Sequence, residues 1–286
     1  LFTANLTNRP LPPLGESSAP EGVIHVERRR FLWSGRMYER LRLTNYSDRG
    51  IRLPLQLLFD ADFRDMFEVR GQTRSRRGSL DTGQIAARCV ALRYQGLDQV
   101  QREVVLSFSQ DPRRLSARLA EFQMLLDPGE HSALYVEVGD LPSEPSRERW
   151  RAGAARARWS LRGRRRRGAR VRVPARLFQA WIDKSESDLA LLTTDLPTGP
   201  YPYAGIPWFS TPFGRDAVIT ALQTLWVDPT LARGVLKFLA VHQAVEISAF
   251  RDAEPGKIMH ETRKGEMAAV NGLPFGRFHG GGGTTP

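Results

Sequence analysis

The 286-residue chain has one cysteine, few lysines and no long apolar run. The single cysteine, Cys89, excludes an internal disulfide and is typical of a reducing compartment, so a cytoplasmic location is predicted. Cys89 lies in the alternating run QIAARCVALRY, which favours a buried side chain over a reactive thiol. No run approaches the roughly 18 apolar residues that span a bilayer, so no membrane association is predicted.

Several motifs with well-understood chemistry are missing from the sequence. It contains no GxxxxGK[ST] phosphate loop, no GxGxxG after a strand pattern and no GxSxG nucleophile turn. His260 has no second histidine or cysteine at ligand spacing. These absences argue against the usual nucleotide and serine-hydrolase sites, and no metal site is predicted.

The basic residues are almost all arginine, since only Lys184, Lys237, Lys257 and Lys264 are lysines among 42 Lys and Arg. The net charge is +11, and the densest arginine run extends from residue 147 to residue 176. Such a run either forms a solvated helix and linker or attracts nucleic-acid phosphates. The first interpretation is favoured, because no nucleic-acid motif and few aromatic residues accompany the run.

The first half of the sequence is typical of short strands separated by turns. The runs GVIHVERRRFLW and RMYERLRLTNY flank Ser34-Gly35 and predict a hairpin. Further strand patterns follow, including REVVLSFS, and the turn DPGE precedes HSALYVEV. Together they predict an antiparallel β-sandwich that ends near residue 141.

The second half is typical of helices. Residues 143–163 predict an exposed connecting helix, and residues 175–193 place apolar side chains at spacings of three, four and seven. Residues 215–226 and 229–244 predict two more helices, with Asp228 as an N-cap and Pro229 at the first helical position. Two apolar helices joined by a tight turn form an αα-hairpin, the unit of an all-α bundle or toroid.

The loop YPYAGIPWFSTPFGRD, residues 201–216, is the first candidate site. Prolines stiffen it, so its rings are held in fixed poses at low entropic cost. Aromatic faces stack on the C–H faces of sugars, and the pair Arg215 and Asp216 offers donors and acceptors that match adjacent hydroxyls. The alternative is structural: Asp216 is a charge favoured in the first turn of a helix, and the rings belong to a core.

A second cluster, PGKIMHETRKGEMAAVNG, follows at residues 255–272. Two carboxylates on one loop can act as acid and base, and inverting glycosidases hold such groups roughly 6.5–9.5 Å apart. Glu261 and Glu266 are candidates for that pair. The alternative is an exposed loop held by salt bridges.

Long stretches of the chain resemble the glycogen-debranching-enzyme-like amylo-α-1,6-glucosidase family. TANLTNRPL, HVERRRFLWSGRMYERLRLTNYSD and LPLQLLFDADFRDMFEVRG resemble its N-terminal sandwich domain. GPYPYAGIPWFSTPFGRDAVITALQTLWVDPTLARGVLKFLAVHQ and DAEPGKIMHETRKGEMA resemble the start of its catalytic domain. The resemblance covers nearly the whole chain. It implies an (α/α)6 barrel that hydrolyses α-glucosidic bonds, typically the α-1,6 branch of glycogen, without an organic cofactor.

The resemblance also implies roles for individual residues. Arg215 and Asp216 correspond to the pair that holds the non-reducing sugar. The remaining expected substrate-binding residues are Tyr203, Trp208 and Phe209, which line the same pocket, and His260, Glu261, Arg263 and Glu266, which form a further wall. The general acid and base of this barrel class are expected beyond Pro286, so Glu261 and Glu266 are no longer favoured as that pair and the catalytic residues stay unknown.

The sequence therefore predicts a two-domain β and α protein. Residues 1–141 are expected to form the antiparallel β-sandwich, residues 142–176 a basic helical linker, and residues 177–286 the first helices of an incomplete (α/α)6 barrel. The predicted partner is an α-glucan or glycogen-like oligosaccharide, and a nucleic-acid partner is not expected. The predicted function is glucan debranching, with this chain a fragment without the acid and base. The alternative is a non-catalytic glucan-binding module or an inactive truncated product.

Overall fold

The computed structural model of the chain describes residues 1–14, 17–270 and 272–280. The last part of the third predicted domain, residues 281–286 with most of the glycine run, lies outside the described residues. The contacts divide the chain into two compact units. Unit 1 comprises Leu1–Phe63 and Arg76–Arg158, and unit 2 comprises Arg64–Ser75 and Trp159–Pro286.

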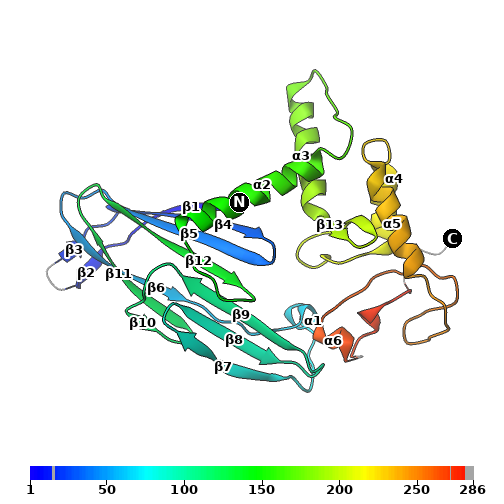
Figure 1. Cartoon of the computed structure of the whole chain (residues 1–286), viewed down its shortest axis with the longest axis horizontal. Helices are drawn as coiled ribbons and strands as arrows, with labels where there is room; N and C mark the ends of the chain where they lie inside the picture. Colours follow the sequence, from blue (N-terminus) through cyan, green and yellow to red (C-terminus); the bar gives the residue numbers. More distant parts are fainter. Residues whose placement is uncertain (15–16, 271, 281–286) are drawn as a thin grey trace. The chain divides into compact units, whose positions relative to one another are not determined.

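Unit 1 consists mainly of antiparallel strands (Figure 1). Among the described residues, the larger sheet has the strand order β1-β4-β5-β12-β9-β8-β7 and the smaller one the order β10-β11-β6, while β2 and β3 pair with each other. Their bounds are β1 Phe2–Thr7, β2 Leu11–Leu14, β3 Ser17–Ala19, β4 Ile24–Trp33, β5 Arg36–Asn45, β6 Ile51–Leu58, β7 Ser79–Ala86, β8 Cys89–Gln95, β9 Gln101–Phe108, β10 Arg114–Leu115, β11 Leu119–Leu126 and β12 His131–Gly139.

The hairpin of β4 and β5 is the best-defined local feature of unit 1. Its strands pair from Ile24 opposite Asn45 to Trp33 opposite Arg36. The two turn residues, Ser34 and Gly35, have φ of 50° and 71°. A two-residue turn with both φ values positive matches the twist of the flanking strands. The predicted hairpin is confirmed at this position.

The two main sheets of unit 1 share one hydrophobic core. The larger sheet contributes buried side chains such as Leu43, Phe108 and Leu134, and the smaller sheet contributes Phe122 and Leu126. In β6 and β11 buried residues alternate with more exposed ones, as expected for two sheets packed face to face. The prediction of an antiparallel β domain in the first half is therefore confirmed.

Helix α2 (Arg147–Arg165) begins in unit 1 and ends in unit 2. In unit 1, Gly153 is buried, and a β-carbon there would lie 3.3 Å from the rings of Phe31 and Tyr38. Arg149 donates to both carboxylate oxygens of Glu137 at 2.7 and 2.9 Å. The first turns of the predicted connecting helix are thus held against the sheet by packing and by an ion pair.

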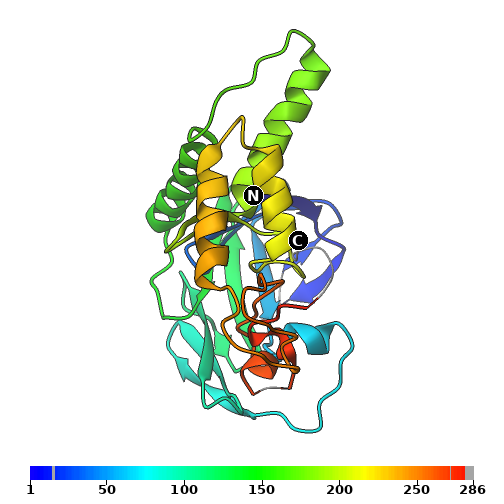
Figure 2. The ribbon, with the colours of Figure 1, turned by 90° about the vertical axis from the view of Figure 1, so that its right-hand side faces the viewer.

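Unit 2 is built from helices, one strand pair and long loops. Its elements are α1 Met66–Val69, α3 Arg176–Leu192, β13 Thr193–Leu196, β14 Gly199–Pro202, α4 Gly214–Gln223, α5 Pro229–Val241, α6 Glu266–Ala269 and the 3-10 helix η1 Pro274–Gly276. Figure 2 shows α4 in yellow beside α5 in orange, and Asp228 caps α5 by accepting from the backbone N–H of Thr230. The predicted helices and this N-cap are confirmed. A closed barrel is not.

The core of unit 2 lies between the β13–β14 pair and the helices α4 and α5. Tyr201, Ala217, Val235 and Phe238 are buried there. Gly234 lets α5 approach β14 closely, because a β-carbon at this position would lie 2.2 Å from the carbonyl oxygen of Pro200. A helix interior normally favours alanine over glycine, so the close approach explains this residue.

We predict that Gly234→Ala destabilises unit 2 by roughly 2 kcal/mol, because backbone atoms must move to admit the methyl group. The matched control is Gly163→Ala in α2, where no atom lies within 4 Å of the added β-carbon. There the better helix propensity stabilises the protein by up to about 1 kcal/mol. Urea unfolding of both variants measures the two changes. A neutral or stabilising effect of Gly234→Ala would contradict the packing described.

Candidate functional site

The first turn of α4 presents the predicted Arg215–Asp216 pair. Arg215 Nε lies 4.0 Å from Asp216 Oδ2, and the two side chains are 48% and 40% exposed. The backbone N–H of Gly214, one residue earlier, donates to the carbonyl of His260 at 2.8 Å. A carboxylate in the first turn is favoured by the helix dipole. Its exposure also leaves it accessible to a hydroxyl-bearing ligand.

The aromatic rings of the proline-rich loop before α4 fall into two groups: some are buried in the core, and others are exposed to solvent. Tyr201 is fully buried, and its hydroxyl donates to the carbonyl of Phe213 at 2.8 Å. Burial raises the pKa of the Tyr201 hydroxyl, so the group stays protonated and keeps this bond. Tyr203 is partly buried against the core. Trp208 and Phe209, at 36% and 44% exposed, remain available for stacking.

The structure brings the second predicted cluster against this loop. Phe213 forms an antiparallel bridge with Glu261, and the backbone N–H of Thr262 donates to the carbonyl of Pro212 at 3.3 Å. The ring of His260 meets Phe213 edge-on at 5.8 Å between centroids. The two stretches that the sequence separates by about 50 residues are therefore neighbours, as a shared site requires.

Arg263 connects the second cluster to the proline-rich loop. Its side chain is only 9% exposed, and its Nε donates to Glu261 Oε2 at 2.8 Å. Nη1 donates to the carbonyl of Trp208 at 2.8 Å, and the guanidinium lies 5.2 Å from the ring of Phe213. Glu261 is thus held in a buried ion pair, which suits a structural carboxylate better than a proton donor or acceptor.

Glu266, at the start of α6, is held in a similar way. Its side chain is 3% exposed, and its Oε2 lies 2.9 Å from Nη1 of Arg74. Arg74 also pairs with Glu68 at 3.0 Å. Both carboxylates of the second cluster are therefore paired with buried arginines. The arrangement argues against the acid–base pair first considered for Glu261 and Glu266.

Sequence reasoning missed the segment of residues 64–75, which supplies Arg74. This segment belongs to unit 2 although the residues on either side of it belong to unit 1. Asp65 caps α1 in a capping box with Glu68. The D-x-x-E spacing is a signal for the helix start. Nothing in the sequence indicates that Asp65 also accepts a hydrogen bond from Met267, 202 positions later, at 3.1 Å.

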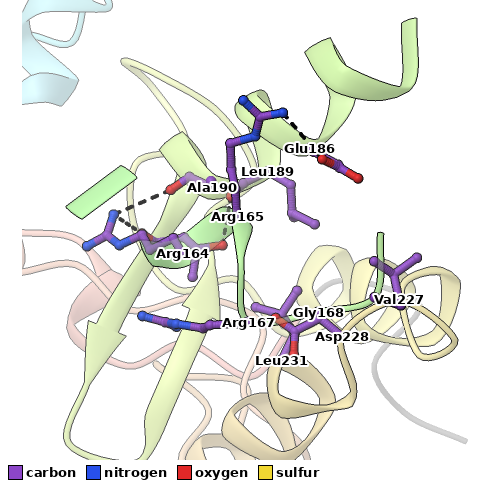
Figure 3. A pocket seen from close by; sticks show the side chains of 12 residues that line it. Arg164, Arg165, Arg167, Gly168, Glu186, Leu189, Ala190, Val227, Asp228 and Leu231 are labelled. Carbon is purple, nitrogen blue, oxygen red and sulfur yellow. Dashed lines mark hydrogen bonds and ion pairs between the residues drawn. The ribbon is translucent and has the colours of Figure 1, made fainter. Parts of the chain in front are cut away.

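Arg164, Arg165 and Arg167 of the arginine run line a small cavity in unit 2 (Figure 3). Arg164 donates to the carbonyl of Thr193 at 2.8 Å and to Asp195 at 3.2 Å. Arg167 donates to the other oxygen of Asp195 at 2.7 Å, and Arg165 pairs with Glu186 at 3.4 Å. These arginines connect the end of α2 to α3 and β13, which accounts for part of the basic run without a nucleic acid.

Among residues 1–14, 17–270 and 272–280, no three His, Cys, Asp or Glu side chains are grouped so that they could hold a metal ion. In the same part of the chain, no helix has both the length and the apolar character needed to cross a bilayer.

Comparisons with known proteins give one family match and structural likenesses. Residues 1–137 match the family described as the N-terminal domain of some glycogen debranching enzymes. A search of curated proteins found no match. A solved structure described as a kojibiose phosphorylase from the human microbiome aligns with 77% of this chain, at 10% identity and a TM-score of 0.53. A polysaccharide lyase aligns with 46% of this chain and 22% of its own, at 18% identity and a TM-score of 0.28.

The phosphorylase likeness concerns the fold alone because the sequence identity is so low. The chain spans 32% of the length of that protein, so it corresponds to a minor part of the larger molecule.

We predict that Asp195→Asn lowers the melting temperature at neutral pH. Burial works to raise the pKa of Asp195, but hydrogen bonds and charge from Arg167 and Arg164 outweigh it and lower the pKa below its ordinary value of 3.8. A depressed carboxyl pKa stabilises the fold above the unfolded value, and the benefit is lost as pH falls through the folded value. The effect stays below about 1 kcal/mol because the side chain is half exposed.

The measurement is a melting curve of both proteins between pH 7 and pH 3. The difference in melting temperature should shrink below about pH 3.8. Asp48→Asn, at a side chain exposed to solvent in unit 1, is the control and should leave the curve unchanged. A difference for Asp195→Asn that is constant with pH would rule out the ion pair as its cause.

Proposed function

We propose that this chain, whose residues 1–137 match the N-terminal domain family of some glycogen debranching enzymes, is part of an α-1,6-glucosidase and binds the end of its glucan substrate. The family match supports glucan processing in general. The α-1,6 specificity rests on the resemblance of residues 199–243 and 252–268 to the start of an amylo-α-1,6-glucosidase domain. The substrate is an α-glucan or glycogen-like oligosaccharide, and the enzyme is cytoplasmic and needs no cofactor.

One observation carries the proposal: Arg215 and Asp216 present exposed side chains at the start of α4, and the rings of Trp208 and Phe209, a few residues earlier in the chain, are exposed as well. The carboxylate accepts from one sugar hydroxyl while the guanidinium donates to its neighbour, and an indole or phenyl ring stacks on the pyranose. Tyr203 packs against the core of unit 2 and the ring of His260 meets Phe213 edge-on, so both are proposed to border the sugar from the two loops. The side chains of Glu261, Arg263 and Glu266 shape the wall behind it rather than touch the sugar.

The proposed domains are those expected from the sequence. Residues 1–141 form the sandwich domain, residues 142–176 the basic linker and residues 177–286 the opening of an (α/α)6 barrel. Support for a barrel comes from α4. Its Ala217 and Ala221 are buried, yet Val218, Ile219 and Leu222 on its other side are 42–71% exposed. Large apolar side chains exposed opposite the buried face of a helix favour a covering partner, so further helices are expected to cover this side.

Hydrolysis in such an enzyme needs a general acid and a general base, which the roles proposed above do not include. A carboxylic acid protonates the glycosidic oxygen and a carboxylate activates water. Within the described residues, the candidate loops offer Glu261 and Glu266 for such roles, and both are buried against arginines. That pairing favours a second candidate function for the chain by itself, a glucan-binding module without catalysis.

We predict that Asp216→Ala weakens maltoheptaose binding about ten-fold or more, because a charge-assisted hydrogen bond is lost. Titration calorimetry measures the dissociation constant. Asp188→Ala is the matched control, since that aspartate is similarly exposed on α3. Equal affinity of wild type and Asp216→Ala would overturn the assignment of the site. Glucose release from a branched dextrin by the chain alone would instead overturn the binding-module alternative.

We further predict that the 286-residue chain self-associates at micromolar concentration through the exposed face of α4 and the turn after it. Leu222 and Trp226 are 71% and 70% exposed there. Leu222→Glu combined with Trp226→Gln should shift the chain toward monomer in sedimentation velocity. Leu32→Glu, at a similarly exposed leucine in unit 1, should have no effect. A wild-type chain that sediments as a single monomeric species would contradict the proposal that the exposed face of α4 is normally covered by further barrel helices.

A further inference from the structure

The segment of residues 64–75 is a feature that the proposed function does not explain. It follows β6 and precedes β7 in sequence, so the surrounding residues build the sandwich core of unit 1. The segment itself belongs to unit 2. Figure 1 shows its helix α1, in cyan, beside the red helix α6. A stretch from the first half of the chain thus belongs to a unit that otherwise begins at Trp159.

Both ends of the segment are anchored to residues 265–267 of the second candidate cluster. Arg74 pairs with Glu68 and Glu266, and all three side chains are at most 10% exposed. Asp65 accepts from the backbone N–H of Met267 at 3.1 Å. A β-carbon on Gly265 would lie 2.4 Å from Asp65 Oδ2, so glycine is needed for this approach. Paired and buried charges of this kind fix geometry, because separating them leaves a charge uncompensated.

Aromatic stacking continues the same contact. The ring of Phe67 stacks on Phe275 at 5.3 Å between centroids, with an angle of 10° between the ring planes. The guanidinium of Arg263, which also holds the carbonyl of Trp208, lies 5.7 Å from the Phe67 ring. The segment therefore packs on the same arginine that joins the two loops of the site.

The middle of the segment contacts Trp208, the indole proposed to stack on the sugar. The exposed residue Arg70, which follows α1, places its guanidinium carbon 5.9 Å from the centre of the Trp208 ring. A cation over one face of an indole is attracted to it and fixes the ring. A pyranose can then stack only on the part of Trp208 that Arg70 leaves open.

We propose that residues 64–75 form a third wall of the glucan site, in which Arg70 is a positioning residue that holds Trp208 ready to stack on a terminal glucosyl unit. This inference rests on the proposed function of the site. Arg74 and Asp65 anchor the wall, and Arg70 acts through Trp208 rather than on the sugar. Some of the residues that orient the ligand would then lie in the first half of the chain.

The test is a double-mutant cycle between Arg70 and Trp208 in the full chain, with maltoheptaose binding measured by calorimetry. Arg70→Ala should weaken binding about two- to five-fold, as expected for an exposed cation–π contact. Arg70→Lys should retain most of the affinity. In a Trp208→Ala background, adding Arg70→Ala should change the dissociation constant no further. Gln72→Ala, at an exposed residue of the same segment, is the matched control.

The outcomes separate the inference from the proposed function. No maltoheptaose binding by the wild type would overturn both. Wild-type binding that Arg70→Ala leaves unchanged would overturn the third wall alone. Equal losses from Arg70→Ala with and without Trp208 would also overturn it, since Arg70 would then act independently of that ring. A melting temperature of Arg70→Ala equal to that of the wild type excludes misfolding as the cause of any loss.

Discussion

The candidate site depends on one buried guanidinium, that of Arg263. It donates to Glu261 and to the carbonyl of Trp208, and it lies over the rings of Phe67 and Phe213. Three stretches of chain meet on this one side chain. Because a guanidinium has five donors in a fixed plane, it can satisfy several acceptors at once while its faces contact aromatic rings. An ammonium in its place would hold fewer of these partners.

This arrangement explains the role of the buried carboxylates. Burying a charge is costly, and removing one partner of a buried pair typically costs about 3–5 kcal/mol. Glu261 and Glu266 are each matched with an arginine, so their charges serve to fix loops. Asp216 differs, because it stands at the surface where a ligand can reach it. The same residue type thus has two uses in one site, and burial distinguishes them.

Local features of the fold could be predicted from the sequence because they depend on nearby residues. The Ser34-Gly35 turn, the Asp228 cap and the helix over residues 176–192 each follow from short-range chemistry. The neighbouring positions of the 201–216 and 260–266 loops were expected only from the family resemblance. The role of Arg74 could not be predicted, since its partner Glu266 lies 192 positions later and no periodicity connects them. The substrate-binding roles and the domain boundaries stay predictions.

The segment of residues 64–75 also bears on how the chain acquires its structure during synthesis. The ribosome releases this segment early, whereas its partners at residues 263–275 emerge only about 200 residues later. Closing so large a loop has a high entropic cost, although that cost grows only slowly with length. Until the partners appear, the carboxylates and rings of the segment are exposed to water and can form non-native contacts with other parts of the chain. Its helix has only four residues, too few to persist alone even with the Asp65 and Glu68 cap, so the order of the segment depends on those later partners.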